Sequence, residues 1–361
     1  MNRAHKIRIY PTPQQEQILL QQVGGVRFVY NWTLEQWNKW VEDKKNGVRN
    51  DNPNWVKLSA IWTEERPEWA HAITRTAVTY AIRSVNMSFM NHFKNGFGWP
   101  KFKKRGACKD SFHLGCDKCF IRPDGRHIRM PLIKQDIRMA EVPRFKGKIL
   151  SYTVSTYSGR WYVSVQMDVE DNRSAPDSVC GVDVGMKTPA VCSDGTTLTL
   201  PQDQLQSLDK RLRRSQRRLS KTQKGSRRRS RALRRKQRIQ DKINRIRRDK
   251  IHKFTSSVCK NHATVVIEDL EARKMHEGSK HLRAGMFRSC MYETLRQLRY
   301  KAIKIIIADK WYPSTQLCSS CGSRHKLSIK TRTYKCPDCG NIMDRDLNAA
   351  INLSMYPGSQ G

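Results

Sequence analysis

The sequence predicts a multidomain fold that combines an all-α part, an all-β part and an α/β part. Three observations lead to this prediction. At 361 residues the chain exceeds the usual size of one domain, so we expect two to four compact units. Residues 11–95 carry apolar side chains at helical spacing, whereas residues 97–170 form short alternating runs separated by turn residues. From residue 178 onward, strand-like and helix-like segments are mixed.

The N-terminal segment predicts a strand followed by helices. The strand is KIRIY, residues 6–10, and the sequence TPQQ after it predicts a helix start in which Thr12 is the N-cap and Gln15 completes a capping box. We expect Gly24 and Gly25 to interrupt this helix, which then resumes with one apolar face. The residues of that face are Tyr30, Leu34, Trp37 and Val41.

A further helix and a set of hairpins complete the first half of the chain. The helix is expected over residues 67–94. Its apolar stripe comprises Ile73, Ala77, Ala81, Val85 and Phe89. Turn residues predict one hairpin around Gly125 and a second around Gly159. Residues 97–177 should therefore form a small β-barrel, to which residues 1–10 add a strand, so that the helical unit 11–96 is an insertion.

The α/β part begins at residue 178. Its first three strand candidates are SVCGVDVG, TPAVCSD and TTLTL, which span residues 178–200. Residues 203–260 predict two helices joined by the loop KTQKGS at residues 221–226. The apolar seam of these helices is Leu205, Leu208, Leu212, Leu219, Ile239, Ile243 and Ile246. Because a solvated charged tail would lack such a seam, we expect the helices to pack on a folded body.

Charge is the strongest signal in the composition. The 69 Lys and Arg residues against 32 Asp and Glu residues give a formal net charge of +37, which predicts a nucleic-acid partner. Positions 210–250 are the most basic stretch, and positions 97–106 mix basic with aromatic residues. The candidate nucleic-acid-binding residues are Lys101, Lys103, Lys104, Arg105, Arg227, Arg228, Arg229, Arg234 and Arg235.

The sequence also bears on the compartment. We find neither an apolar run long enough to span a membrane nor the apolar core of a signal peptide, so we expect a cytoplasmic protein that associates with the nucleoid in use. The 11 cysteines fit a reducing compartment if some of them bind metal.

Three acidic residues stand in positions that predict catalysis. Asp183 lies in the middle of an apolar strand candidate, Glu268 directly follows the apolar run VVI, and Asp346 precedes a helix-forming run. If these elements meet, the like charges need cations, and carboxylate oxygens suit Mg²⁺ or Mn²⁺. Two such ions can promote phosphodiester hydrolysis, which predicts a nuclease. Taken singly, each acid could instead be a surface residue or a salt-bridge partner, and Asp346 could be a helix N-cap.

Two C-x2-C pairs separated by fourteen residues have zinc-ribbon spacing, and a glycine follows each pair. The four predicted ligands of one structural Zn²⁺ are Cys318, Cys321, Cys336 and Cys339. Cys116 and Cys119 form another C-x2-C pair, with Cys108 and His113 upstream. Because this pair lacks a second knuckle, the sequence leaves open whether it binds metal.

Taken together, these motifs resemble those of the TnpB family, transposon-encoded RNA-guided DNA endonucleases related to type V CRISPR effectors. The resemblance covers nearly the whole chain, and the motifs that carry it are KIRIYPTPQQEQ, VRFVYNW, WPKFKKRG, IRPDGRHIRMP, GVDVGMKTPAV, VVIEDL, PSTQLCSSCG, CPDCG and DRDLNAAINL. It implies a RuvC-like RNase H fold whose three acids match Asp183, Glu268 and Asp346. Asp344 is the nearest rival for the third acid, but the family's acid stands two residues before Asn-Ala-Ala, here starting at Asn348.

The resemblance also implies a domain plan. Residues 1–10 and 97–177 would form a wedge-type β-barrel that holds a helical recognition lobe, residues 11–96. Residues 178–309 and 341–361 would form the nuclease domain. The zinc ribbon, residues 310–340, would be inserted before the last acid.

The implied activity is cleavage of double-stranded DNA that a guide RNA selects, next to a short target-adjacent motif, in one site with two Mg²⁺ or Mn²⁺ ions. A non-cleaving RNA-guided regulator is one alternative, although none of the three acid motifs is broken. An accessory transposase protein is the other. The sequence does not indicate the guide RNA, the target-adjacent motif or the oligomeric state.

Overall fold

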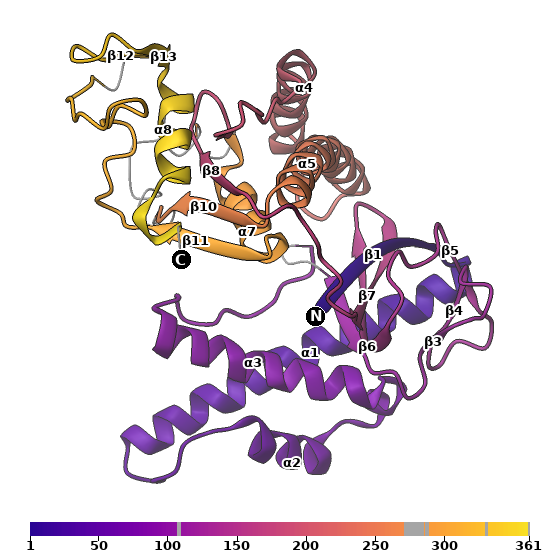
Figure 1. The fold of residues 1–361 in the computed structure, drawn as a ribbon. Helices are drawn as coiled ribbons and strands as arrows, with labels where there is room; N and C mark the ends of the chain where they lie inside the picture. Colours follow the sequence, from indigo (N-terminus) through magenta and orange to yellow (C-terminus); the bar gives the residue numbers. More distant parts are fainter. Residues whose placement is uncertain (107–109, 271–284, 286–288, 329–330, 360–361) are drawn as a thin grey trace. The chain divides into compact units, whose positions relative to one another are not determined.

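The computed structural model describes residues 1–106, 110–270, 285, 289–328 and 331–359. The chain divides into two compact units, unit 1 (Met1–Asp171) and unit 2 (Asn172–Gly361). Figure 1 shows the elements of both units. Within the described ranges, no helix is both long and apolar enough to cross a membrane.

Unit 1 contains one antiparallel sheet of seven strands in the order β2-β6-β7-β1-β5-β4-β3. Its strands are β1 (Asn2–Tyr10), β2 (Asp110–Leu114), β3 (Phe120–Ile121), β4 (His127–Arg129), β5 (Ile137–Met139), β6 (Lys148–Tyr157) and β7 (Arg160–Asp168). The two predicted hairpins are confirmed as β3–β4 and β6–β7. The N-terminal strand β1 lies between β7 and β5. Among the described strands the sheet has two edges, β2 and β3, so it is a half-barrel, whereas we expected a small β-barrel.

The helices of unit 1 are α1 (Pro13–Lys45), α2 (Trp55–Glu65), the 3-10 helix η1 (Glu68–Ala72) and α3 (Arg75–Asn95). The capping box of Thr12 and Gln15 is confirmed at the start of α1. The predicted interruption at Gly24 and Gly25 is wrong, because α1 continues through both residues. An added Cβ on Gly25 would lie 2.1 Å from Cδ1 of Ile73, so this glycine allows close packing and does not break the helix.

The helix predicted over residues 67–94 is divided in two. The backbone of Ile73 is extended between η1 and α3, and the side chain of Gln22 in α1 satisfies the backbone on both sides of the break. Its amide donates to the Ala72 carbonyl at 2.7 Å, and its oxygen accepts from the Thr74 N–H at 2.9 Å. Helix α2 was not predicted, although Asn54 caps its start by accepting from the Lys57 N–H.

Unit 2 is built around a four-stranded sheet in the order β11-β10-β8-β9. Its strands are β8 (Val179–Asp183), β9 (Val191–Cys192), β10 (Thr264–Glu268) and β11 (Lys304–Ala308). Strands β11, β10 and β8 are parallel to one another, and β9 is antiparallel to β8. The predicted strand TTLTL is reduced to one bridge between Val191 and Thr197. A small sheet of β12 (Thr333–Lys335) and β13 (Ile342–Asp344) lies near the C-terminus.

The helices of unit 2 cover both faces of the four-stranded sheet (Figure 1). They are α4 (Gln202–Ser220), α5 (Arg227–Asn261), α7 (Met291–Lys301), α8 (Arg345–Ser354) and the short η3 (Pro357–Ser359). Val182 and Ile267 pack with α4, α5 and α7 in one apolar cluster. Val266 packs with Leu353 of α8 in a separate cluster on the opposite face. The two predicted basic helices are confirmed as α4 and α5.

Candidate functional site

The sheet register brings Asp183 and Glu268 together. Strands β8 and β10 are parallel neighbours, and Val182 pairs with Ile267. The next step of the same register places Glu268 opposite Asp183 at the carboxyl ends of the two strands. Because side chains alternate along a strand, both acids lie on the face that α8 covers, with Gly181 and Val266.

Close packing of α8 on β8 brings in the third acid. An added Cβ on Gly181 would lie 2.0 Å from the carbonyl oxygen of Ala350 and 2.4 Å from the backbone N of Ser354. A glycine is therefore required for this helix to touch the strand. Asp183 lies two residues beyond Gly181, about 6.6 Å along the strand. Asp346 lies about one helical turn before Ala350, or about 6 Å along the helix, and its charge acts on the carboxyl group of Asp183, so the two acids lie at the same end of this contact.

Electrostatics agree with this convergence. Burial, and then the charges of Glu268 and Asp346, raise the pKa of Asp183 from 3.8 to about 7. The Arg345 guanidinium acts in the opposite direction, but it does not outweigh them. The three carboxylates are thus close enough to repel one another, and a cation would relieve the repulsion.

Asp346 and Asp344 have different roles in the structure. Asp344 is exposed and is the N-cap of α8, since its carboxylate accepts from the N–H groups of Asp346 and Leu347 at 2.9 and 3.1 Å. Asp346 is 7% exposed, and its carboxylate lies 3.1 Å from the Arg345 guanidinium. The alternative in which Asp346 is the N-cap is therefore wrong, and the geometry favours Asp346 over Asp344 as the third acid.

Ser314 is a member of this site that the sequence did not indicate. Its buried hydroxyl donates to a carboxylate oxygen of Glu268. Its carbonyl oxygen accepts from the side-chain amide of Asn352 in α8 at 2.7 Å. Only the sequence PSTQLCSSCG next to the first knuckle could have drawn attention to it.

The acid site has the donor chemistry for hard divalent cations. Its three carboxylates offer oxygen ligands, which Mg²⁺ and Mn²⁺ prefer. The ligand oxygens of these three described residues do not all lie within 4.8 Å of one another. The residues fit such ions in chemistry and charge, in a looser arrangement than the cysteine cluster.

The four predicted cysteines do form one compact cluster. The sulfur atoms of Cys318, Cys321, Cys336 and Cys339 all lie within 4.8 Å of one another. Two of the sulfur–sulfur distances, Cys318 to Cys339 and Cys321 to Cys336, are 3.6 Å. This arrangement can hold one metal ion with all positions filled, which is typical of a structural site.

Each knuckle is shaped by its own backbone. The N–H of Gly322 donates to the Cys318 carbonyl at 2.9 Å, and the N–H of Gly340 donates to the Cys336 carbonyl at 3.1 Å. Both glycines have positive φ, 77° and 73°, which side chains disfavour. Burial opposes ionisation of Cys318, but hydrogen bonds from the N–H groups of Cys321 and Ser320, together with those from the thiols of Cys339 and Cys321, lower the pKa of its thiol to about 6. The first knuckle is therefore prepared to present a thiolate.

The knuckle is tied to the acid site through α8. Asn348 accepts from the N–H of Ser319, inside the first knuckle, at 2.9 Å, and donates to the Leu317 carbonyl at 2.6 Å. Asn352 donates to the same carbonyl at 2.7 Å. Both amides are almost fully buried. Helix α8 thus connects the cysteine cluster to Asp346 and, through Ser314, to Glu268.

The third C-x2-C pair lacks such surroundings in the described residues. Cys119 is buried in the core of unit 1, and the thiol of Cys116 donates to the Ile149 carbonyl at 3.2 Å. His113 bonds Thr153 and packs on the ring of Tyr80. No described group of three ligands within 4.8 Å includes this pair, and Cys108 lies outside the described residues.

The predicted basic residues differ in their surroundings. Most are exposed, and these are Lys101, Lys104, Arg105, Arg227, Arg228, Arg234 and Arg235. The ammonium of Lys103 lies 3.7 Å from the centre of the Tyr30 ring. The guanidinium of Arg229 donates to the carbonyls of Leu219 and Thr222 at 3.1 and 2.8 Å, so it caps the end of α4. A hollow of about 370 Å³ next to it is lined by Arg227, Arg231 and Arg234.

Three segments match known family models. Residues 162–278 match a family described as "Probable transposase", and residues 292–353 match the "Cas12f1-like, TNB domain". Residues 1–46 match a "Helix-turn-helix domain". In this structure that last segment is β1 followed by the single unbroken helix α1.

Whole-chain comparisons extend these matches. A protein of Streptomyces pristinaespiralis, provisionally named an RNA-guided DNA endonuclease, is 30% identical over 98% of this chain and 89% of its own length. The Escherichia coli (strain K12) protein InsQ, with the same provisional name, is 30% identical over 97% of this chain and 91% of its own. A Cas12f1 chain, solved in complex with sgRNA and target DNA, matches with a TM-score of 0.56 at 14% identity, covering 98% of both chains. This last match shows a shared fold.

Proposed function

Because the chain belongs to the TnpB family of RNA-guided DNA endonucleases, we propose that it binds a guide RNA and cleaves the double-stranded DNA that this RNA selects. One observation carries the proposal. Asp183, Glu268 and Asp346 converge on the α8 face of the four-stranded sheet, where β8 and β10 are parallel, in a chain with a net charge of +37. The charge supports binding of RNA and DNA, and the acids support hydrolysis.

We assign unit 2 a RuvC-like, RNase H-like nuclease fold in residues 178–309 and 341–361, with the zinc ribbon in residues 310–340. We assign residues 1–10 and 97–177 to the wedge and residues 11–96 to the recognition lobe. All of these residues lie in unit 1 except 172–177, which lie in unit 2. The parallel strands β8, β10 and β11, with acids at the carboxyl ends of β8 and β10, support the nuclease assignment. The match of residues 292–353 to the TNB domain supports the ribbon.

In the proposed reaction, Asp183, Glu268 and Asp346 hold two Mg²⁺ or Mn²⁺ ions. When bound, such ions lower the pKa of the attacking water and stabilise the leaving oxygen in phosphodiester hydrolysis. Ser314 holds one oxygen of Glu268 and leaves the other available as a ligand. Asp344 keeps the first turn of α8 in place, and with it Asp346. We assign one structural Zn²⁺ to the four cysteines.

The test is guided cleavage of a linear DNA substrate. The protein is purified with its own RNA, the RNA is sequenced, and substrates with matched or scrambled target sequence are compared in Mg²⁺ buffer and in buffer without divalent metal. We expect only the matched substrate to be cleaved, and only in the Mg²⁺ buffer. Equal cleavage of both substrates would exclude RNA guidance, and guided binding without cleavage would make the protein a regulator.

A further inference from the structure

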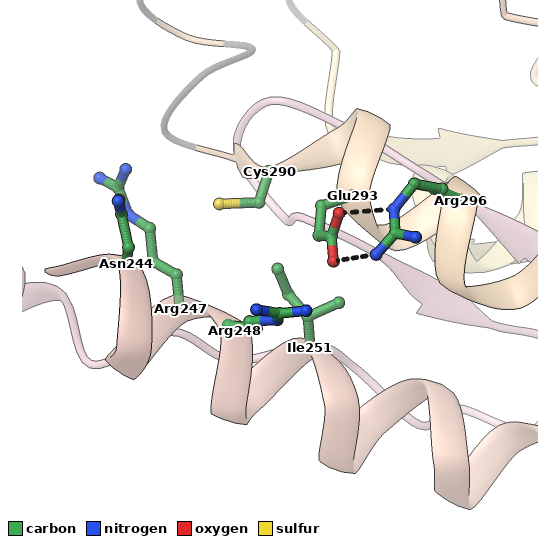
Figure 2. Close-up of a pocket in the computed structure, with 7 residues that line it drawn as sticks. All are labelled: Asn244, Arg247, Arg248, Ile251, Cys290, Glu293 and Arg296. Atoms are coloured by element: carbon green, nitrogen blue, oxygen red, sulfur yellow. Dashed lines mark hydrogen bonds and ion pairs between the residues drawn. The ribbon is translucent and has the colours of Figure 1, made fainter. Parts of the chain in front are cut away.

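A hollow of about 380 Å³ lies between α5 and the start of α7, within unit 2. Figure 2 shows that Asn244, Arg247 and Arg248 project into it from successive turns of α5, and that Glu293 and Arg296 face them from α7. None of these residues was among the sequence-based candidates. The hollow also lies outside the group of three acids, which occupy the opposite face of the sheet.

The lining of the hollow is strongly positive. It has three guanidinium groups and one carboxylate, a net charge of +2. The carboxylate is already engaged, since Arg296 donates to both oxygens of Glu293 at 2.8 Å and Gln297 donates to one of them at 2.8 Å. Burial, and then the charges of Lys301 and Arg248, lower the pKa of nearby His252 to about 4.

Two further features favour an anion there. Arg247 is 6% exposed, so its guanidinium is held in place and binds with little loss of side-chain freedom. Cys290, which lines the hollow, is the N-cap of the eleven-residue helix α7. The positive end of the helix dipole therefore adds to the arginines.

We propose that this hollow binds a backbone phosphate of the nucleic acid that the protein carries or recognises. The inference rests on the proposed function, because that function supplies the polyanion. Among the lining side chains, guanidinium groups and an amide predominate over apolar groups, which favours phosphate over an apolar ligand. The guide RNA and the target DNA share this phosphodiester chemistry, and the experiment separates them.

The experiment compares Arg248→Gln with Arg245→Gln. Both arginines are exposed on α5, but Arg245 does not line the hollow and lies 3.3 Å from Asp241. Affinity is measured across a salt series, first for the copurifying guide RNA and then for a matched DNA duplex bound by the RNA-loaded protein. In one of these arms, Arg248→Gln should reduce the slope of log affinity against log salt by about 0.7 to 0.9, the loss of one phosphate contact. Arg248→Lys should keep the slope, and Arg245→Gln should leave it unchanged.

If the slope changes in the RNA measurement, the hollow binds the guide RNA, and if it changes in the DNA measurement, the hollow binds the target DNA. A change in either measurement supports the inference. An unchanged slope for Arg248→Gln in both arms, while the wild type binds, would overturn it. So would an equal loss for Arg245→Gln, because the effect would then be one of general charge. If the wild type bound neither RNA nor DNA, the proposed function itself would fail. Circular dichroism of each variant checks that the chain is folded.

Discussion

The cysteine cluster and the acid site of unit 2 both gather negative charge that a cation would neutralise, yet they are built in opposite ways. The cysteines stand on two short knuckles, each closed by the backbone N–H of its own glycine. The acids come from two strands and a helix, and only sheet register and the contact at Gly181 bring them together. The comparison teaches that one site depends on local turns and the other on tertiary contacts, and that α8 links the two through its bonds to the first knuckle.

The largest expected effect is on cleavage. Replacing Asp183, Glu268 or Asp346 with alanine should reduce guided cleavage by about a thousandfold or more, because each loss dismantles the same metal site. For the same reason, the Asp183→Ala/Asp346→Ala double variant should be no worse than either single variant. Guided DNA binding, measured by gel shift, should persist.

Asp344→Ala is the matched control for this series. It removes the N-cap of α8, so it should lower the free energy of unfolding by about 1 kcal/mol, and it should reduce cleavage far less than Asp346→Ala because the third carboxylate is kept. Normal cleavage by Asp346→Ala together with loss in Asp344→Ala would reverse the assignment of the third acid.

The second effect concerns metal content. Cys318→Ser should lower bound zinc from about one ion per chain to nearly none, because a structural site needs all four thiolates. Cys116→Ser, in the other C-x2-C pair, should leave zinc content unchanged. Elemental analysis of protein prepared in reducing buffer measures both. Equal zinc in the two variants would show that the four cysteines do not hold the ion.

A smaller effect is expected at Ser314. Ser314→Ala removes a hydrogen bond to a charged group, a contribution of about 1.5 to 3 kcal/mol, and should slow cleavage about tenfold or more. Ser314→Thr keeps the hydroxyl and should restore much of the rate. The affinity of the acid site for Mn²⁺, measured by electron paramagnetic resonance, should fall in Ser314→Ala but not in Ser314→Thr. An affinity equal to that of the wild type would restrict Ser314 to a structural role.

The smallest expected effect is on stability and concerns pH. Asp183 has a raised pKa of about 7 in the folded protein, so the folded state binds more protons than the unfolded state between about pH 4 and 7. Stability in buffer without Mg²⁺ should therefore fall as pH rises through this window, by a few kcal/mol at most. Asp183→Asn should flatten the profile of melting temperature against pH, and added Mg²⁺ should do the same to the wild type. A wild-type profile that is already flat would contradict the crowding of the three acids.

The sequence predicted features that neighbouring residues determine. The capping box at Thr12, the hairpins around Gly125 and Gly159 and the knuckles at Gly322 and Gly340 all depend on local backbone chemistry. In each of these features, the side chain or turn that determines the local backbone lies within a few residues of that backbone.

Features set by distant contacts were missed. Gly25 does not break α1 because Ile73 packs against it, and the helix expected from residue 67 is divided where Gln22 binds the backbone. Ser314 belongs to the acid site only because α8 and β10 meet there. No sequence spacing encodes these partners, since each joins elements that only the tertiary fold brings together.

The amides of Asn348 and Asn352 have a consequence for the order in which the protein matures. They are buried, and their partners are backbone groups in and just before the first knuckle. In a chain that has not taken up zinc, these amides would lose their partners, at about 1 to 3 kcal/mol for each unsatisfied group. Helix α8 carries Asp346, so we expect newly made protein to become able to cut only after zinc has been loaded. Zinc uptake would then act as a checkpoint in biogenesis, ahead of any encounter with DNA.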